Sequence, residues 1–185
     1  MITVIDGTPI KDKLYHGTPD YFQRVNLNMG KERKDFGKGF YLSYEKSHSR
    51  DIALRNMRLK KVSIGYLYTY SVNIEELTNL VKTGSVKYFP TADISWFDFV
   101  LKSRSCSHTW HTYSIVIGPT ADDNTKVQFN LYRQGVYGLV GSDQAKLLMI
   151  SNLHPENLGV QLFIANPNGL SILNEKTRVV ERLRR

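Results

Sequence analysis

The sequence predicts an α+β fold with a mostly antiparallel, split β-sheet and flanking helices. Short β-prone runs are interspersed with helical patterns, without the long and regular strand–helix–strand rhythm of a doubly wound parallel sheet. The chain has no internal repeat and no low-complexity linker, and 41% of its 185 residues are hydrophobic. A chain of this length and composition is expected to form one domain, spanning residues 1–185.

The first predicted elements are two short strands separated by a long loop. Residues 13–16 and 39–43 are β-prone, and each run is joined to glycine. Residues 19–34 are polar and predict a loop with at most one helical turn. Ser43 is expected to cap a helix over residues 44–60.

The predicted helix over residues 44–60 has one strongly basic side. Ile52, Ala53 and Met57 predict its buried face. The opposite face carries five basic residues, which are Arg50, Arg55, Arg58, Lys60 and Lys61. This face is either a solvated surface or a groove that binds phosphates.

The middle of the chain predicts further strands and helices. The expected elements are a strand over residues 65–72, a helix over 74–82, an amphipathic helix over 93–104 and a strand over 113–117. Gly84 is expected to end the first of these helices, and Gly118-Pro119 to stop the second strand. The residues of helix 93–104 that are expected to face inward are Trp96, Phe97, Val100 and Leu101.

The C-terminal third predicts two more helices and a strand. Their expected ranges are residues 123–133, residues 142–151 with Ser142 as the cap, and a strand over 160–164 that is broken at Asn166-Pro167. In the second of these helices the residues expected to be buried are Leu147, Leu148 and Ile150. Residues 169–185 fit either a helix or a last strand.

Charge and cysteine content narrow the function classes. The formal net charge of +8 favours an anionic partner such as a nucleic acid, a dinucleotide or an acidic protein, or it merely aids solubility. The single cysteine, Cys106, favours a reducing compartment. No apolar run has the length of a signal peptide or of a membrane span, so we expect a cytoplasmic protein with no membrane partner.

Two short stretches, Leu14-Tyr15-His16-Gly17-Thr18 and the run from Asp35 to Ser43, have the composition of a ligand site. Glycine lets the backbone approach a ligand closely, and a strand fixes the side chain beside it. On pattern alone, His16 and Tyr41 are either core residues or members of such a site. In a site, the imidazole would donate to a sugar hydroxyl, and the phenol ring would stack on a flat heteroaromatic group.

Three other patterns are weaker. Gly37-Lys38-Gly39 lacks the third glycine of a dinucleotide fingerprint and leads into a strand rather than a helix. Cys106, His108 and His111 match no zinc signature, so we predict a polar loop there and no metal. Asp122 and Asp123 follow a predicted strand and fit either a turn with a helix cap or catalytic carboxylates.

Leu14–Thr18 and the run from Gly37 to Ser43 resemble the first two motifs of the histidine–tyrosine branch of the ADP-ribosyltransferases. Diphtheria toxin and the poly(ADP-ribose) polymerases belong to that branch. More closely, the chain is similar to a bacterial family of ADP-ribosyltransferase-like domains that was catalogued as of unknown function. Its members are often encoded beside a small partner, like toxin and antitoxin. The similarity covers about residues 13–173 and implies the split, mostly antiparallel sheet of the ADP-ribosyltransferases.

The resemblance implies a role for each motif residue. His16 would bond the adenosine ribose of NAD, the Gly17 backbone would pair with the nicotinamide amide, and Tyr41 would stack on the nicotinamide ring. Gln161 would take the third-motif position. The implied catalytic residues are thus His16, Tyr41 and Gln161, and the implied NAD-binding residues are His16, Gly17, Thr18, Gly39, Tyr41 and Ser43.

Gln161 departs from the glutamate that the well-studied enzymes have at this position. A glutamine keeps the hydrogen bond to the ribose and loses the charge, which at an intermediate dielectric is worth about 4 kcal/mol at contact range. This difference predicts a slower enzyme, an acceptor that is activated elsewhere, or a domain that binds NAD without turning it over. The carboxylates that could supply the missing charge are Asp122, Asp123 and Glu156.

The resemblance therefore predicts an NAD-dependent mono-ADP-ribosyltransferase. NAD would be its substrate, and a protein or nucleic acid would accept the ADP-ribose as nicotinamide leaves. Such a protein would act as a toxin-like effector with a small co-encoded antitoxin. The alternatives are a non-catalytic module that binds NAD, ADP-ribose or RNA, and a plain nucleic-acid-binding domain in which the motif pair is coincidental.

Overall fold

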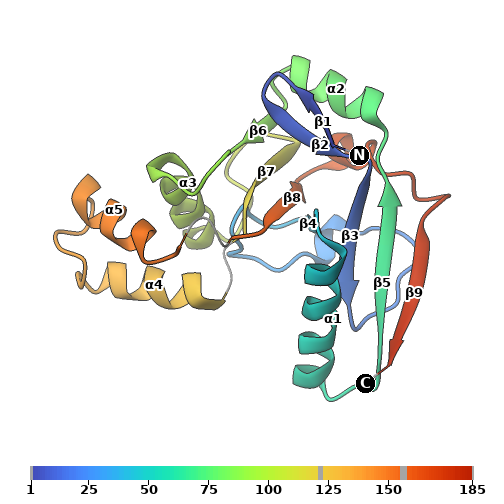
Figure 1. The fold of residues 1–185 in the computed structure, drawn as a ribbon, viewed down its shortest axis with the longest axis horizontal. Coiled ribbons are helices and arrows are strands. Elements are labelled where there is room, and N and C mark those ends of the chain that lie inside the picture. The colour runs from blue at the N-terminus through green and yellow to red at the C-terminus, as the bar shows by residue number, and fades with distance from the viewer. Residues whose placement is uncertain (1, 121–122, 155–157, 185) are drawn as a thin grey trace.

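The computed structural model describes residues 2–120, 123–154 and 158–184. The strands of its main sheet are β3 (Lys13–Thr18), β4 (Phe40–Ser43), β5 (Ile64–Ser71), β6 (Val86–Tyr88), β7 (Ile115–Pro119), β8 (Val160–Ile164) and β9 (Val179–Arg184). Within the described residues they run in the order β6-β7-β8-β4-β3-β5-β9, and only β6 and β7 pair in parallel. Figure 1 shows helices around this sheet, so the α+β class is confirmed.

The helices are α1 (Lys46–Lys60), α2 (Ile74–Lys82), α3 (Ile94–Ser105), α4 (Asp123–Arg133), α5 (Asp143–Ser151) and α6 (Pro167–Leu170). The long loop contains a short 3-10 turn, Leu27–Met29, which agrees with the prediction of at most one helical turn there. Of the segment 169–185, which the sequence left open, residues 169–170 end α6 and residues 179–184 form the strand β9. Among the described residues, none of these helices has the length and apolar character needed to cross a bilayer.

The sheet opens between β3 and β4. β3 pairs with β5 along its whole length, from Lys13 opposite Ser71 to Thr18 opposite Tyr66. Its register with β4 is limited to Tyr15 opposite Ser43. Beyond that pair the two strands diverge, so the sheet is split at the place where the two sequence motifs meet.

α1 covers one face of β3 and β5, as Figure 1 shows. Its buried residues are Ser49, Ala53 and Met57, one per turn, and its predicted basic residues are exposed. Ser43 does not cap this helix, which begins at Lys46. The Ser43 hydroxyl instead accepts the N–H of Glu45 at 3.0 Å and closes a short turn ahead of the helix.

The helices α3, α4 and α5 form an apolar lobe, at the left of Figure 1, whose core continues onto Val116 of β7 and Phe163 of β8. Trp96, Phe97 and Val100 are buried in it as predicted, and Leu101 is half-buried. The expectation that Leu147 and Leu148 are buried is wrong, since they are 55% and 46% exposed. The buried residues of α5 are Ala145, Met149 and Ile150, whose spacing of four to five residues places them on the opposite side of the helix.

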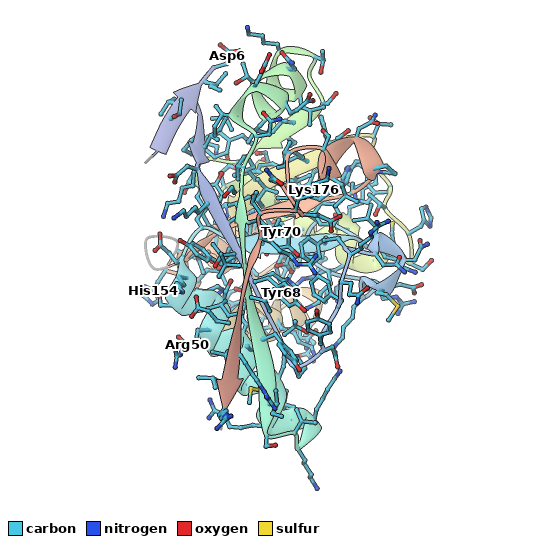
Figure 2. All side chains as sticks on the ribbon, turned by 90° about the vertical axis from the view of Figure 1, so that its right-hand side faces the viewer. Asp6, Arg50, Tyr68, Tyr70, His154 and Lys176 are labelled. Atoms are coloured by element: carbon cyan, nitrogen blue, oxygen red, sulfur yellow. The ribbon has the colours of Figure 1, made fainter. Side chains whose placement is uncertain are left out.

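The structure also contains strands that the sequence did not predict. A hairpin of β1 (Ile2–Ile5) and β2 (Thr8–Lys11) precedes the main sheet, and its turn, at the top of Figure 2, has positive φ at Asp6 (47°) and Gly7 (78°). An Asp-Gly pair is the sequence signal of such a turn. Ile10 is 1% exposed, so the core extends beyond the range that the resemblance covers.

The strand predicted over residues 113–117 is shifted. It begins at Ile115 and includes Gly118 and Pro119, which lie opposite Gln161 and Val160 of β8. A proline is tolerated there because β6 pairs with β7 only as far as Ile117, so Pro119 lies at an edge on that side. The shift matters for the site, because it places the Pro119 carbonyl beside Gln161.

Candidate functional site

A hydrogen bond joins the two sequence motifs across the opening of the sheet. His16 of β3 lies with Nδ1 2.8 Å from the carbonyl oxygen of Tyr41 in β4. A carbonyl only accepts, so Nδ1 carries the proton and donates. The backbone of one motif is thereby fastened to the side chain of the other.

The His16 ring lies in an aromatic setting. It is half-buried, 4.5 Å from the Phe40 ring and 5.8 Å from the Phe22 ring, measured between ring centroids. Burial lowers the pKa of His16 below its ordinary value of 6.5, and the bond to Tyr41 only partly opposes this. The neutral ring leaves Nε2 as an acceptor, whereas the sequence led us to expect a donor.

Tyr41 is held through its hydroxyl. The hydroxyl donates to the Gly37 carbonyl at 2.8 Å and accepts the N–H of Phe36 at 3.0 Å. Burial, followed by the nearby Asp35 carboxylate, raises the pKa of Tyr41 well above its ordinary value, so the phenol stays neutral. Its half-buried ring lies 4.8 Å from the Phe163 ring.

Gln161 lies close to Tyr41 on the same face of the sheet. It is directly opposite Ser43, while Phe163, two residues further along β8, is opposite Tyr41. Side chains at such diagonal positions are within reach of each other. The Gln161 amide nitrogen is 3.0 Å from Asp35 Oδ2, so Tyr41 and Gln161 both bind the segment of residues 35–37.

His16 reaches this group through the backbone only. Register places Tyr15 and Ser43 opposite each other, so Tyr15 and Gly17 share the face of Tyr41 and Gln161, and His16 leaves β3 on the other face. Its ring packs with Phe22, Phe40 and Tyr68. Figure 2, viewed from the side of β9, shows Tyr68 and Tyr70 on β5. Leu67, between Tyr66 and Tyr68 on the same strand, faces the opposite side of the sheet and packs with α1.

Gly17 lies where β3 meets α1. A Cβ added to Gly17 would be 1.7 Å from the carbonyl oxygen of Ser49 and 3.1 Å from Cβ of Ala53. No real Cβ approaches an oxygen that closely, so only glycine fits. The glycine allows the helix start and the strand to come together beside the opening of the sheet.

The remaining predicted NAD-binding residues have local structural contacts. The Thr18 hydroxyl accepts the N–H of Asp20 at 3.1 Å in a turn. Gly39 lies so close to β8 that a Cβ would be 2.3 Å from the Ile164 carbonyl oxygen. Ser43 is 5% exposed and directly opposite Gln161.

Sequence reasoning missed the side chains that hold residues 35–39. Arg104 of α3 donates to Asp35 Oδ1 from Nε at 3.0 Å and from a terminal nitrogen at 2.7 Å. His111 Nε2 lies 2.8 Å from the Phe36 carbonyl oxygen, and the Thr109 hydroxyl donates to the Lys38 carbonyl at 3.0 Å. Asp35 begins the second motif, but nothing in the sequence pairs it with residues so far away.

The carboxylates named from the sequence cannot be placed at the site. Asp122 and Glu156 lie outside the described residues, and Asp123 begins α4 with its side chain outside the description. Within the described part of the chain, Asp35 is a carboxylate in contact with Gln161. No group of three or more His, Cys, Asp or Glu side chains suited to a metal ion occurs among the described residues.

Two open cavities lie outside this group. One, of about 520 Å³, is lined by residues that include Arg24, Asn73 and Glu175. The other, of about 510 Å³, is lined by Tyr15, Tyr44 and lysines at positions 11, 13 and 46. Neither is lined by His16, Tyr41 or Gln161, although Tyr15 brings the second cavity to the closed end of the β3–β4 opening.

Comparison with known proteins gives a family. A family model described as "Protein of unknown function (DUF3990)" matches residues 13–174. No curated protein and no solved structure matches the chain. The match extends from the first residue of β3 to the segment that follows α6, and so includes His16, Tyr41 and Gln161. The chain therefore belongs to the DUF3990 family.

Proposed function

We propose that this protein is an NAD-dependent ADP-ribosyltransferase that transfers ADP-ribose to a macromolecular acceptor and releases nicotinamide. The observation that carries the proposal is the 2.8 Å hydrogen bond from the His16 ring to the Tyr41 carbonyl. It connects, at the opening of the sheet, the two motifs on which the resemblance to ADP-ribosyltransferases rests. Both residues lie in the range that the family match covers.

In the proposed reaction the bond between the nicotinamide nitrogen and the ribose carbon breaks. Its electron pair leaves with nicotinamide, positive charge develops on the ribose, and an acceptor atom attacks that carbon and gives up a proton. Gly17 and Tyr41 would hold the nicotinamide, and His16 Nε2 would accept from the adenosine ribose. Because this cleavage needs little nucleophilic push, positioning supplies most of the rate.

Gln161 would accept a hydrogen bond from the 2′-hydroxyl of the nicotinamide ribose. It carries no charge, and the Asp35 carboxylate beside it is paired with Arg104. The electrostatic stabilisation of the ribose cation is therefore weaker than a free carboxylate would give. We expect a slow enzyme, suited to modifying a cellular target and not to rapid turnover of NAD.

The acceptor that we propose is a protein or a nucleic acid in the cytoplasm. The net charge of +8 and the exposed basic face of α1 favour an anionic macromolecule. A toxin-like role with a small co-encoded antitoxin follows from the resemblance. Overproduction should then arrest growth of the host and the partner should relieve the arrest, whereas harmless overproduction of the folded protein would count against this role.

A module that binds NAD, ADP-ribose or RNA without turnover is the second candidate. The neutral Gln161 and the pairing of Asp35 with Arg104 favour it, because neither leaves a free charge for the ribose cation. Such a module would melt at a higher temperature with NAD and release no nicotinamide. An RNA-binding module would instead bind RNA with a steep salt dependence that changing His16 does not affect.

Labelling of a cell extract from NAD tests the proposal. The wild type, His16→Ala and Tyr41→Ala proteins are incubated with extract and NAD labelled on the adenosine side, and protein and nucleic acid are analysed by mass spectrometry. We expect ADP-ribose on a defined acceptor with the wild type and none with either variant. Equal labelling by all three folded proteins, or none by the wild type, would exclude the transferase.

A further inference from the structure

The group around Gln161 contains a buried carboxylate that none of the implied roles uses. Asp35 and Gln161 are each 8% exposed, and the side chain of Arg104 is 14% exposed. They come from the loop before β4, from β8 and from α3. Arg104 is also held over the Phe129 ring at 5.0 Å, so the ion pair is fixed from two sides.

The contacts of Gln161 fix which way its carboxamide points. The amide nitrogen lies 3.0 Å from Asp35 Oδ2 and 3.3 Å from the Pro119 carbonyl oxygen. An ionised carboxylate and a carbonyl both only accept, so the group that faces them must be the NH₂. The reversed amide would place its oxygen against two acceptors, which excludes that orientation.

The carboxamide oxygen of Gln161 is consequently turned away from Asp35 and Pro119. Among the described residues it has no hydrogen-bond partner. In the described chain, the fully buried side-chain atoms without a hydrogen-bond partner are Tyr70 Oη and His111 Nδ1. The Gln161 oxygen is therefore not fully buried. A buried acceptor with no partner would be costly, so this oxygen is one that solvent or a ligand can reach.

We propose that Asp35, itself fixed by Arg104, is a positioning residue that turns the oxygen of Gln161 toward the ribose of NAD. This inference rests on the proposed function for the identity of the ligand, while the orientation rests on the contacts alone. Asp35 touches no reacting atom; it acts through Gln161. Together with Pro119 it sets the only orientation in which a neutral amide can accept from a ribose hydroxyl.

The same contacts explain a glutamine where other ADP-ribosyltransferases have glutamate. A glutamate at position 161 would bring its carboxylate to about the distance of the present amide, 3.0 Å from Asp35 Oδ2. Two carboxylates cannot both stay ionised at that distance without a cation between them, and Arg104 already binds the other oxygen of Asp35. Glutamine is therefore the residue that this site accepts.

A double-variant cycle tests the inference. In Asp35→Asn, the oxygen of the new amide must accept from Arg104, so its NH₂ faces Gln161 and forces the Gln161 amide to reverse. In Gln161→Glu, two carboxylates face each other. In the double variant the asparagine NH₂ donates to the glutamate, and an acceptor again faces the ligand. Asp98→Asn on α3, which removes an ion pair with Lys146 of α5, is the control.

Nicotinamide release and thermal melting are measured for all five proteins. We expect each single variant to lose about tenfold in kcat with little change in KM. The double variant should recover that loss and reach or exceed the wild type, because its glutamate also brings a negative charge to the ribose cation. Gln161→Glu should also melt about 5 °C lower, and the double variant should melt near the wild type. The control should match the wild type in both measurements.

The melting cycle keeps the inference separate from the proposed function. If the wild type releases no nicotinamide but the double variant recovers the melting temperature lost by Gln161→Glu, the transferase fails and the orientation of Gln161 stands. If Asp35→Asn keeps the kcat of an active wild type, or if the double variant recovers neither quantity, the positioning role of Asp35 is overturned.

Discussion

His16 shows how one contact decides the chemistry of a side chain. The Tyr41 carbonyl accepts a hydrogen bond from Nδ1–H, and burial among the rings of Phe22 and Phe40 favours the neutral imidazole. The ring can then offer only an acceptor at Nε2. Sequence reasoning identified the residue from its motif but could not assign its tautomer, because the partner of Nδ1 is visible only in three dimensions.

The lowered pKa of His16 predicts acid destabilisation. The unfolded chain takes up the proton at about pH 6.5, whereas the folded ring resists it, so the unfolded state binds more protons below that pH. The free energy of unfolding should be at its full value above about pH 6.5 and decrease as the pH falls below it. Burial also lowers the pKa of His111, which adds to the effect in the same direction.

Urea unfolding at about pH 7.5 and about pH 5.5 measures this difference. His16→Asn keeps a donor for the Tyr41 carbonyl and cannot titrate, so its free energy of unfolding should change less between the two pH values. His111→Asn should likewise reduce the change in the free energy of unfolding between the two pH values, independently of His16. An unchanged difference in both variants would contradict the assignment.

The residues of the site were predictable to different degrees. Short motifs whose order could be matched contain His16, Tyr41 and Gln161. Of these, Tyr41 and Gln161 bind the segment of residues 35–37. Asp35 and Arg104 could not be paired from the sequence, because they are 69 residues apart and an ion pair has no periodic signature. Whether the matched residues bind NAD stays a prediction.

At the level of elements, the contact between β3 and α1 depends on the lack of a side chain at Gly17. The Ser49 carbonyl occupies the space where a Cβ would be, at 1.7 Å. A larger residue would have to push the first turns of α1 away from the strand. The position of α1 beside the opening of the sheet therefore requires a glycine at position 17.

Gly17→Ala should lower the free energy of unfolding by about 2 kcal/mol or more, because close packing leaves no room for the methyl group. Gly159→Ala is the matched control, since its Cβ would be 3.7 Å from Thr120, an ordinary contact. Chemical denaturation compares the two. Equal stability of Gly17→Ala and Gly159→Ala would show that α1 does not pack on β3 as described.

Elements with a strong periodic pattern were predicted well. The ranges expected for α2, α4 and β8 agree with the structure, and Ser142 caps α5 through its side chain as expected. The hairpin of β1 and β2 was missed although Asp6-Gly7 signals its turn. β6 has three residues, too few to show a period. The prediction that Ser43 caps α1 was wrong because a serine hydroxyl can close a turn as readily as it caps a helix.

For the whole molecule, the split in the sheet is the feature that matters most. On one side β3, β5 and β9 pack with α1, and on the other β7 and β8 pack with the lobe of α3, α4 and α5 (Figure 1). The two motifs meet where these halves separate. A split, mostly antiparallel sheet was expected from the sequence, but the position of the opening follows from the register of single residues.

Equilibrium binding of a non-hydrolysable NAD analogue, carba-NAD, is the most direct test of an NAD site at this opening. Calorimetric titration is applied to the wild type, His16→Ala, Tyr41→Ala and the control His154→Asn, whose asparagine tolerates the positive φ of 50° at that position. We expect the wild type and the control to bind alike. Each of the other two variants should bind the analogue at least about tenfold more weakly. Equal binding by all four folded proteins, or no binding by the wild type, would contradict an NAD site formed by the two motifs.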